Sequence, residues 1–241
     1  MSFWGSLLTI SPLVAKQVAE AVSIIGPAVR DFATRVGTFI ANSIDKMPAL
    51  MEKVGTFANR ILTLLGILNP GERVDDLGER AMQAAEKGIR ITNFDDMDAY
   101  LEELRQFKLD PKVTEKRNPT ERLIAGVGLG TVAMERKFNV EPGSLEGVWL
   151  IPILNSHFFT PERIASLIAS GRFGPEFIAH LESRLSLQES EALRSRLAVD
   201  EGGQSPAPDH YVELREDLAR LRDDYEALKV KLNENVQRGT P

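Results

Sequence analysis

The chain has 241 residues, 43% of them hydrophobic, and a formal net charge of −6 at pH 7. This composition is sufficient for a packed core, and the absence of cysteine excludes both a disulfide framework and a thiolate metal site. The acidic balance argues against a nucleic-acid partner, because neutralising phosphates requires clustered Lys and Arg.

The chain starts with an apolar stretch, and no charged residue occurs from 1 to 15. It lacks the basic start and the small-residue cleavage site of a secretory signal, so we expect a cytoplasmic protein. Ser11 has the character of an N-cap and Pro12 suits the first helical position, where a missing N–H costs nothing. These two residues predict a first helix that ends near Ile25.

Pro27 and Pro48 each open a further amphipathic helix, and the third ends near Leu68. Each helix has one apolar stripe at helical spacing and one polar face. Residues 1–68 are therefore predicted to form an amphipathic N-terminal module. Its side chains expected to bind a membrane or a partner are Phe3, Trp4, Leu7, Leu8, Phe32, Phe39, Phe57 and Leu65.

Two interpretations of these stripes are open. The helices pack on one another, on the rest of the chain or on sister subunits, or they lie on a membrane surface and insert in concert. No apolar run in the module reaches the roughly 18 to 20 residues that a spanning helix needs. The sequence therefore predicts docking on protein or on a membrane surface, without a membrane span.

Residues 69–199 are expected to form a helical middle domain, because Asn69, Asn118, Thr160 and Ser186 each begin a segment typical of a helix start. The predicted helices cover 70–87, 95–107, 119–137, 145–154, 161–170, 175–184 and 187–198. A short extended piece is possible at 89–92, and the basic segment 108–117 is expected to be a solvated loop. The predicted fold class is all-α, a multi-helix bundle.

Two parts of this domain are expected to be structural. Gly126, Gly128 and Gly130 suggest a phosphate-binding loop, but no Lys-Ser or Lys-Thr follows them and no strand precedes them. Three glycines in a helical window instead predict the close approach of two helices. The stretch 147–159 is the most apolar of the domain, and we expect it to be buried at its centre.

The acidic and histidine residues give no complete catalytic or metal-binding pattern. Asp95, Asp96 and Asp98 are typical of an acidic helix start, and the glycine and terminal Glu of a calcium loop are missing. Glu176 and His180 lie one helical turn apart, but a zinc-hydrolase or two-metal site needs a second such pair. We therefore assign no catalytic, cofactor-binding or metal-ligating residue and expect no cofactor.

The last part of the chain is predicted to be a linker, 200–209, followed by a coiled-coil helix, 210–238. The linker is rich in Gly, Ser and Pro. The helix has apolar residues in a 3,4 alternation, which is typical of a coiled-coil seam. The alternative is a helix folded back on its own chain. The predicted oligomerisation residues are Tyr211, Leu214, Leu218, Leu221, Tyr225, Leu228 and Leu232.

These patterns favour a non-enzymatic helical assembly protein, such as a component of a shell, a virion or a secretion machine. It would dock through residues 1–68 on a hydrophobic partner or a membrane surface and self-associate through its tail. The alternative is a membrane-acting effector of the pore-forming type that inserts its N-terminal helices, and a helical enzyme comes third. The expected location is the cytoplasm, at the membrane periphery or within a larger assembly.

Overall fold

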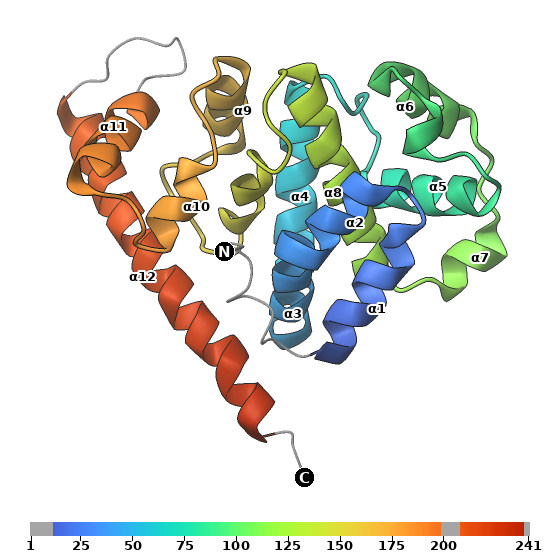
Figure 1. Ribbon diagram of the computed structural model, residues 1–241, viewed down its shortest axis with the longest axis horizontal. Coiled ribbons are helices and arrows are strands. Elements are labelled where there is room, and N and C mark those ends of the chain that lie inside the picture. Colours follow the sequence, from blue (N-terminus) through green and yellow to red (C-terminus); the bar gives the residue numbers. More distant parts are fainter. Residues whose placement is uncertain (1–11, 199–207, 239–241) are drawn as a thin grey trace.

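A computed structural model describes residues 12–198 and 208–238 of the chain. Every regular element in these ranges is a helix, which confirms the all-α class (Figure 1). In chain order the elements are α1 (Pro12–Ser23), α2 (Pro27–Phe32), the π-helical η2 (Ala33–Gly37), α3 (Thr38–Lys46), α4 (Ala49–Leu64), α5 (Val74–Glu86), η3 (Ile91–Asn93), α6 (Met97–Gln106), α7 (Pro111–Lys116), α8 (Pro119–Lys137), η4 (Glu146–Leu150), α9 (Pro161–Ala169), α10 (Glu176–Leu181), α11 (Leu187–Leu197) and α12 (Pro208–Arg238).

Helix α8 lies at the centre of the fold. All of its residues from Leu123 to Glu135 are buried, and it contacts α1 to α6 and η2. A helix that is apolar on all sides must be covered on all sides. The predicted bounds, 119–137, are confirmed, because Asn118 caps the helix through a hydrogen bond from the Thr120 N–H to its side chain (2.8 Å).

The glycines of α8 bring neighbouring helices close, as predicted. A Cβ atom on Gly128 would stand 2.7 Å from Cδ1 of Phe32, and one on Gly130 would stand 2.7 Å from Cδ1 of Leu62. Gly126 lies against the backbone of α5. These positions have no room for a side chain, so the glycines set how closely α8 packs against α2, α4 and α5.

Helices α1 to α4 bury their apolar stripes within the chain. Helices α2, η2 and α3 form one continuous helical run with a π-helical segment in the middle, which the sequence did not predict. The stripes belong to the same hydrophobic cluster as α8 and the segment 145–159. In that segment Trp149 is fully buried and donates from Nε1 to the Thr131 hydroxyl (2.7 Å), so the predicted buried centre at 147–159 is confirmed.

Some helix starts differ from their predicted positions. Asn69 and Glu72 form a turn, in which the Asn69 N–H donates to Glu72 Oε2 (2.7 Å), and α5 begins only at Val74. The segment predicted as a solvated loop contains α7, which Asp110 caps. The 145–154 helix is a short 3-10 helix followed by turns, and a second 3-10 helix, Ile91–Asn93, overlaps the possible extended piece at 89–92. The capping box at Ser186 is confirmed.

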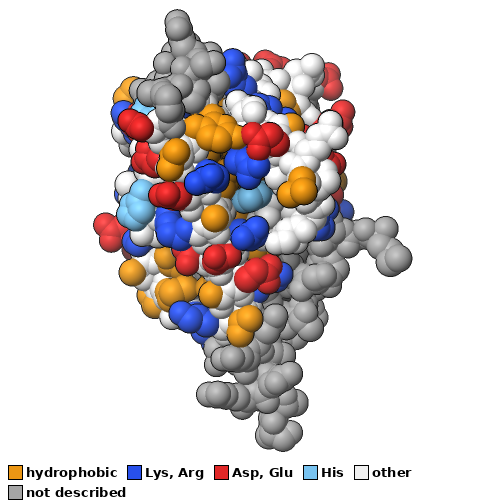
Figure 2. Space-filling model, turned by 90° about the vertical axis from the view of Figure 1, so that its left-hand side faces the viewer, with side chains coloured by type: hydrophobic (Ala, Val, Ile, Leu, Met, Phe, Trp, Pro, Cys, Tyr) orange, Lys and Arg blue, Asp and Glu red, His pale blue; other side chains and the backbone are white. Residues whose placement is uncertain are grey.

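Helix α12 runs diagonally along one side of the molecule, next to α10 and α11 (Figure 1). Its apolar seam is buried at Leu214, Leu218, Leu221, Tyr225, Leu228 and Leu232, and Tyr211 is half-buried. The Tyr225 ring lies 5.7 Å from that of Phe39, and the Asp217 carboxylate accepts from the Ser156 hydroxyl (2.5 Å). The chain itself therefore covers the seam. Figure 2 shows this side of the molecule, on which acidic and basic side chains are interspersed.

Candidate functional site

The residues predicted to bind a partner or a membrane have different environments. Phe32, Phe39 and Leu65 are buried in the core, where they offer no surface. Phe57 is half-buried and packs at the edge of the core. The leader residues Phe3, Trp4, Leu7 and Leu8 lie outside the described residues. Helical periodicity marked the buried face of each helix but did not identify what covers it.

Phe57 borders an open apolar groove of about 620 Å³ between α4 and the segment 151–161. Ile151, Pro152, Phe159 and Pro161 form the rest of its apolar lining. The two cationic residues on its rim have partners within the chain. Arg60 Nε lies 2.7 Å from the Glu162 carboxylate, and Lys53 Nζ donates to the Asn155 side chain (3.3 Å).

A second cavity, of about 640 Å³, lies between α6 and the C-terminal end of α8. Its apolar lining includes Ile67, Met97, Leu101, Val132 and Val140. Its acidic rim is formed by the predicted helix start, where Asp96 Oδ1 accepts from the Asp98 N–H (3.2 Å). Arg136 and Lys137 also line it. A cavity of this size is within the range of small-molecule sites.

Glu135 is the buried ionisable group of this cavity. Its Oε1 accepts hydrogen bonds from the backbone N–H groups of Gly143 (2.8 Å) and Leu145 (3.1 Å). Burial, together with the charge of Glu146, raises the pKa of Glu135 to about 7, against the lowering effects of these hydrogen bonds and of Arg35. The carboxyl group therefore changes its charge near neutral pH.

The charges next to Glu135 are those of an ion pair between Arg35 and Glu146. Arg35, on the π-helical η2, donates from Nε to both carboxylate oxygens of Glu146 (3.1 Å each). Burial raises the pKa of Glu146, and the hydrogen bond and charge of Arg35 oppose that shift. Glu135 and Glu146 were not among the residues that the sequence predicted for a site. The available signal was an acidic residue directly following the apolar run of α8.

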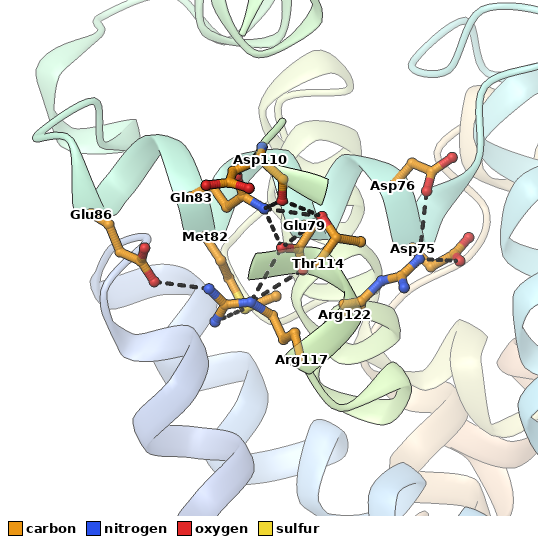
Figure 3. Close-up of polar contacts among 10 residues, drawn as sticks. All are labelled: Asp75, Asp76, Glu79, Met82, Gln83, Glu86, Asp110, Thr114, Arg117 and Arg122. Carbon is orange, nitrogen blue, oxygen red and sulfur yellow. Dashed lines mark hydrogen bonds and ion pairs between the residues drawn. The ribbon is translucent and has the colours of Figure 1, made fainter. Parts of the chain in front are cut away.

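Figure 3 shows a second buried polar cluster, which joins α7 and the start of α8 to α5. Glu79 is fully buried, accepts from Gln83 Nε2 (2.6 Å) and lies 3.1 Å from Arg117 Nε. Gln83 in turn accepts from the Asp110 N–H (2.8 Å) and donates to the Thr114 hydroxyl (3.1 Å). These contacts hold α7 in place, and the cluster does not line either cavity.

The Glu176 and His180 pair does not form a shared site. Glu176 is ion-paired with Arg196 (2.7 Å), whereas His180 Nε2 lies 3.1 Å from the Leu218 carbonyl oxygen on α12. Burial lowers the pKa of His180, and the bond to Leu218 opposes this. Within 12–198 and 208–238, no three His, Asp or Glu side chains come together in a way that could hold a metal ion.

Among the helices within 12–198 and 208–238, none is both long enough and apolar enough to cross a membrane. Comparison of the chain with protein families, curated proteins and solved structures gives no match. The function is therefore inferred from the residues and their geometry alone.

Proposed function

We propose that the chain is a non-enzymatic helical assembly protein, in which the apolar leader of one copy docks into the groove at Phe57 of another. The observation that carries this proposal is the open apolar groove between α4 and the segment 151–161. Open apolar concavities on a folded surface mark docking sites for protein partners. The other predicted docking residues on α2 to α4 are buried.

The apolar part of the lining favours an apolar occupant. On the rim, Arg60 and Lys53 have partners in Glu162 and Asn155, and Glu52 is an exposed carboxylate, so the groove offers a peptide apolar side chains rather than a set of charges of one sign. The first 15 residues of the chain include no charged side chain, and their apolar residues before Ser11 include Phe3, Trp4, Leu7, Leu8 and Ile10. The leader therefore matches the chemistry of the groove.

A leader in the groove of a second copy is a head-to-tail contact, because the two surfaces differ. Such a contact produces rings when the rotation closes and filaments when it does not. The proposal also includes self-association through α12, but by a route that differs from the predicted coiled coil. Its seam is covered by α10, α11 and Phe39 of its own chain, so two copies would share it only by exchanging α12.

Light scattering of the intact protein over a concentration series tests the leader contact. We expect oligomers for the wild type and a single-chain mass for Trp4→Glu and for Phe57→Glu. Leu64→Glu is the matched control, since Leu64 is a 42% exposed apolar residue on α4 outside the groove. This variant should associate like the wild type. A monomeric wild type, up to its solubility limit, contradicts the proposal.

Mixing the two defective variants tests whether the leader and the groove are the two surfaces that meet. The Trp4→Glu protein retains its groove and the Phe57→Glu protein retains its leader, so a mixture should form a capped pair. A mixture that remains single-chain contradicts the pairing of the leader with this groove. Liposome flotation at moderate salt tests the alternative: if flotation depends on Trp4 but not on Phe57, the leader meets lipid and the membrane-acting effector is favoured.

A further inference from the structure

The cavity between α6 and the end of α8 combines an apolar wall with one buried acidic group. The wall is formed by side chains from α2, the turn after α4, α6, α8 and the turn after α8, among them Met97, Leu101, Val132 and Val140. Glu135 lines the same cavity and is only 6% exposed. A ligand that fills the cavity therefore meets hydrocarbon and a single buried carboxyl group.

One oxygen of that carboxyl group is available to a ligand. Oε1 of Glu135 accepts both backbone hydrogen bonds, from Gly143 and Leu145, and holds the turn after α8. Among the described residues, no hydrogen bond reaches Oε2. The guanidinium of Arg35 is hydrogen-bonded to Glu146 rather than to Glu135. A hydrogen-bond donor of a ligand can thus reach Glu135 without disturbing the turn.

The rim makes the cavity more favourable for a cation than for an anion. Asp95, Asp96 and Asp98 lie on the side of α6. Arg136 and Lys137 lie on the side of α8, where Lys137 Nζ donates to the Gly66 carbonyl oxygen (3.3 Å). The acidic side chains therefore outnumber the basic ones, even before Glu135 is counted.

We infer that this cavity binds a small amphiphilic cation, whose ammonium group pairs with Glu135 while its hydrocarbon part lies on the apolar wall. A hydrogen bond between an ammonium group and a buried carboxylate is stronger than one between neutral groups. The site lies on different elements from the groove at Phe57, so the inference is independent of the proposed docking function.

The affinity for such a cation depends on the charge of Glu135. The groups facing this carboxyl are Glu146 and Arg35, and burial with the Glu146 charge raises its pKa to about 7. A primary ammonium group, like that of lysine, keeps its charge between about pH 6 and about pH 8, so the charge that changes in this range is that of Glu135. Binding should tighten about tenfold over this interval and release a proton from Glu135.

Calorimetric titration of the full chain with 2-phenylethylamine, and in parallel with its neutral analogue 2-phenylethanol, tests the inference. We expect the amine to bind about tenfold more tightly at about pH 8, with the difference disappearing at about pH 6. Equal affinities for amine and alcohol, or no binding of the amine, overturn the inference.

Two variants test whether the amine binds in this cavity. Glu135→Gln keeps an acceptor for the Gly143 and Leu145 N–H groups but removes the charge, so the preference for the amine and its pH dependence should be lost. Val140→Trp fills the cavity and should abolish binding of the amine, which also decides the question if the first variant does not fold. Asp95→Asn is the rim control and should retain the pH dependence. Retention of the amine preference in Glu135→Gln overturns the inference.

Discussion

Gly126 on α8 lies against Val74 on α5 so closely that a Cβ atom on residue 126 would stand 1.8 Å from the Val74 carbonyl oxygen. The contact is reciprocal, because a Cβ atom on Gly78 would stand 2.1 Å from the Arg122 carbonyl oxygen. Both obstacles are backbone atoms, which cannot move aside as a side-chain end can. The crossing of α5 and α8 therefore depends on glycine in both helices.

Gly126→Ala should lower the free energy of unfolding by about 3 kcal/mol or more, since the two helices must separate to admit the methyl group. Gly55→Ala on α4 is the control, because a Cβ atom there would make an ordinary contact with Leu123 at 3.8 Å. That substitution should raise the stability by about 0.5 to 1 kcal/mol. Urea unfolding monitored by circular dichroism measures both, and an unchanged midpoint for Gly126→Ala would contradict the packing described.

Arg117→Met should destabilise the fold by about 3 kcal/mol or more, because it leaves the fully buried Glu79 without its cation. Combining it with Glu79→Gln should recover part of this loss, as the buried charge is then removed. Arg73→Met is the control, since the ion pair of Arg73 with Asp75 is 62% exposed on the arginine side and should contribute less than about 1 kcal/mol. Equal losses of stability for Arg117→Met and Arg73→Met would contradict the burial of the Glu79–Arg117 pair.

The titration of Glu135 should lower the stability of the wild type as the pH rises from about 4.5 to about 7. The pKa of Glu135 is about 7 in the folded chain against a usual value of 4.5, so the folded state binds the proton more tightly. The stabilisation is complete below about pH 4.5 and is lost as the pH passes the folded pKa, by up to about 3 kcal/mol.

Glu146 and Glu182 have pKa values shifted in the same direction, so the comparison with Glu135→Gln isolates Glu135. The variant should be more stable than the wild type at about pH 8 and similar to it at about pH 5. Urea titrations across this range measure the difference. A constant difference between the two proteins at all pH values would contradict the assigned pKa shift.

Leu218→Lys should release α12 from α10 and α11, since it places a charge in a seam position that is 1% exposed. We expect a loss of about 3 kcal/mol and faster tryptic cleavage within α12. Val230→Lys is the control on the same helix, because Val230 is 53% exposed and its replacement should change the stability by less than about 0.5 kcal/mol.

The mass of the Leu218→Lys protein distinguishes the two uses of the seam. If each chain covers its own seam, the variant loses stability while its oligomeric state follows that of the wild type. If two copies exchange α12, the mass measured by light scattering falls together with the stability. The first outcome assigns association to the leader, and the second assigns it to α12.

The sequence predicted the helical class and several helices, because the signals for these are local. An N-cap bonds an N–H two or three residues away, so Asn118, Thr160 and Ser186 could be recognised from their neighbours alone. The same capping pattern at Asn69 was misleading. Its Glu72 does return to the Asn69 N–H, but Gly71, with φ of +89°, directs the chain into a turn instead of a helix.

The candidate sites depend on residues that are distant in the chain. The groove at Phe57 brings α4 together with residues 151–161, and the ion pair next to Glu135 joins residues 111 positions apart. The π-helical η2 and the turn at 143–145 have no signal in a periodicity pattern, because each follows from contacts with another element. From the sequence alone, Glu135 can therefore be identified only as an acidic residue, because its environment depends on the position of the turn.

The sequence by itself determined which face of each helix is apolar, since spacing along the chain fixes the faces of a helix. Only the tertiary structure decided what covers each face. The stripes of α2 to α4 and the seam of α12 have the patterns of surfaces that bind membranes or sister chains, and in the structure they are covered by the chain itself. The physical reason is that hydrophobic burial is non-directional and roughly proportional to area, so an apolar stripe does not specify its partner.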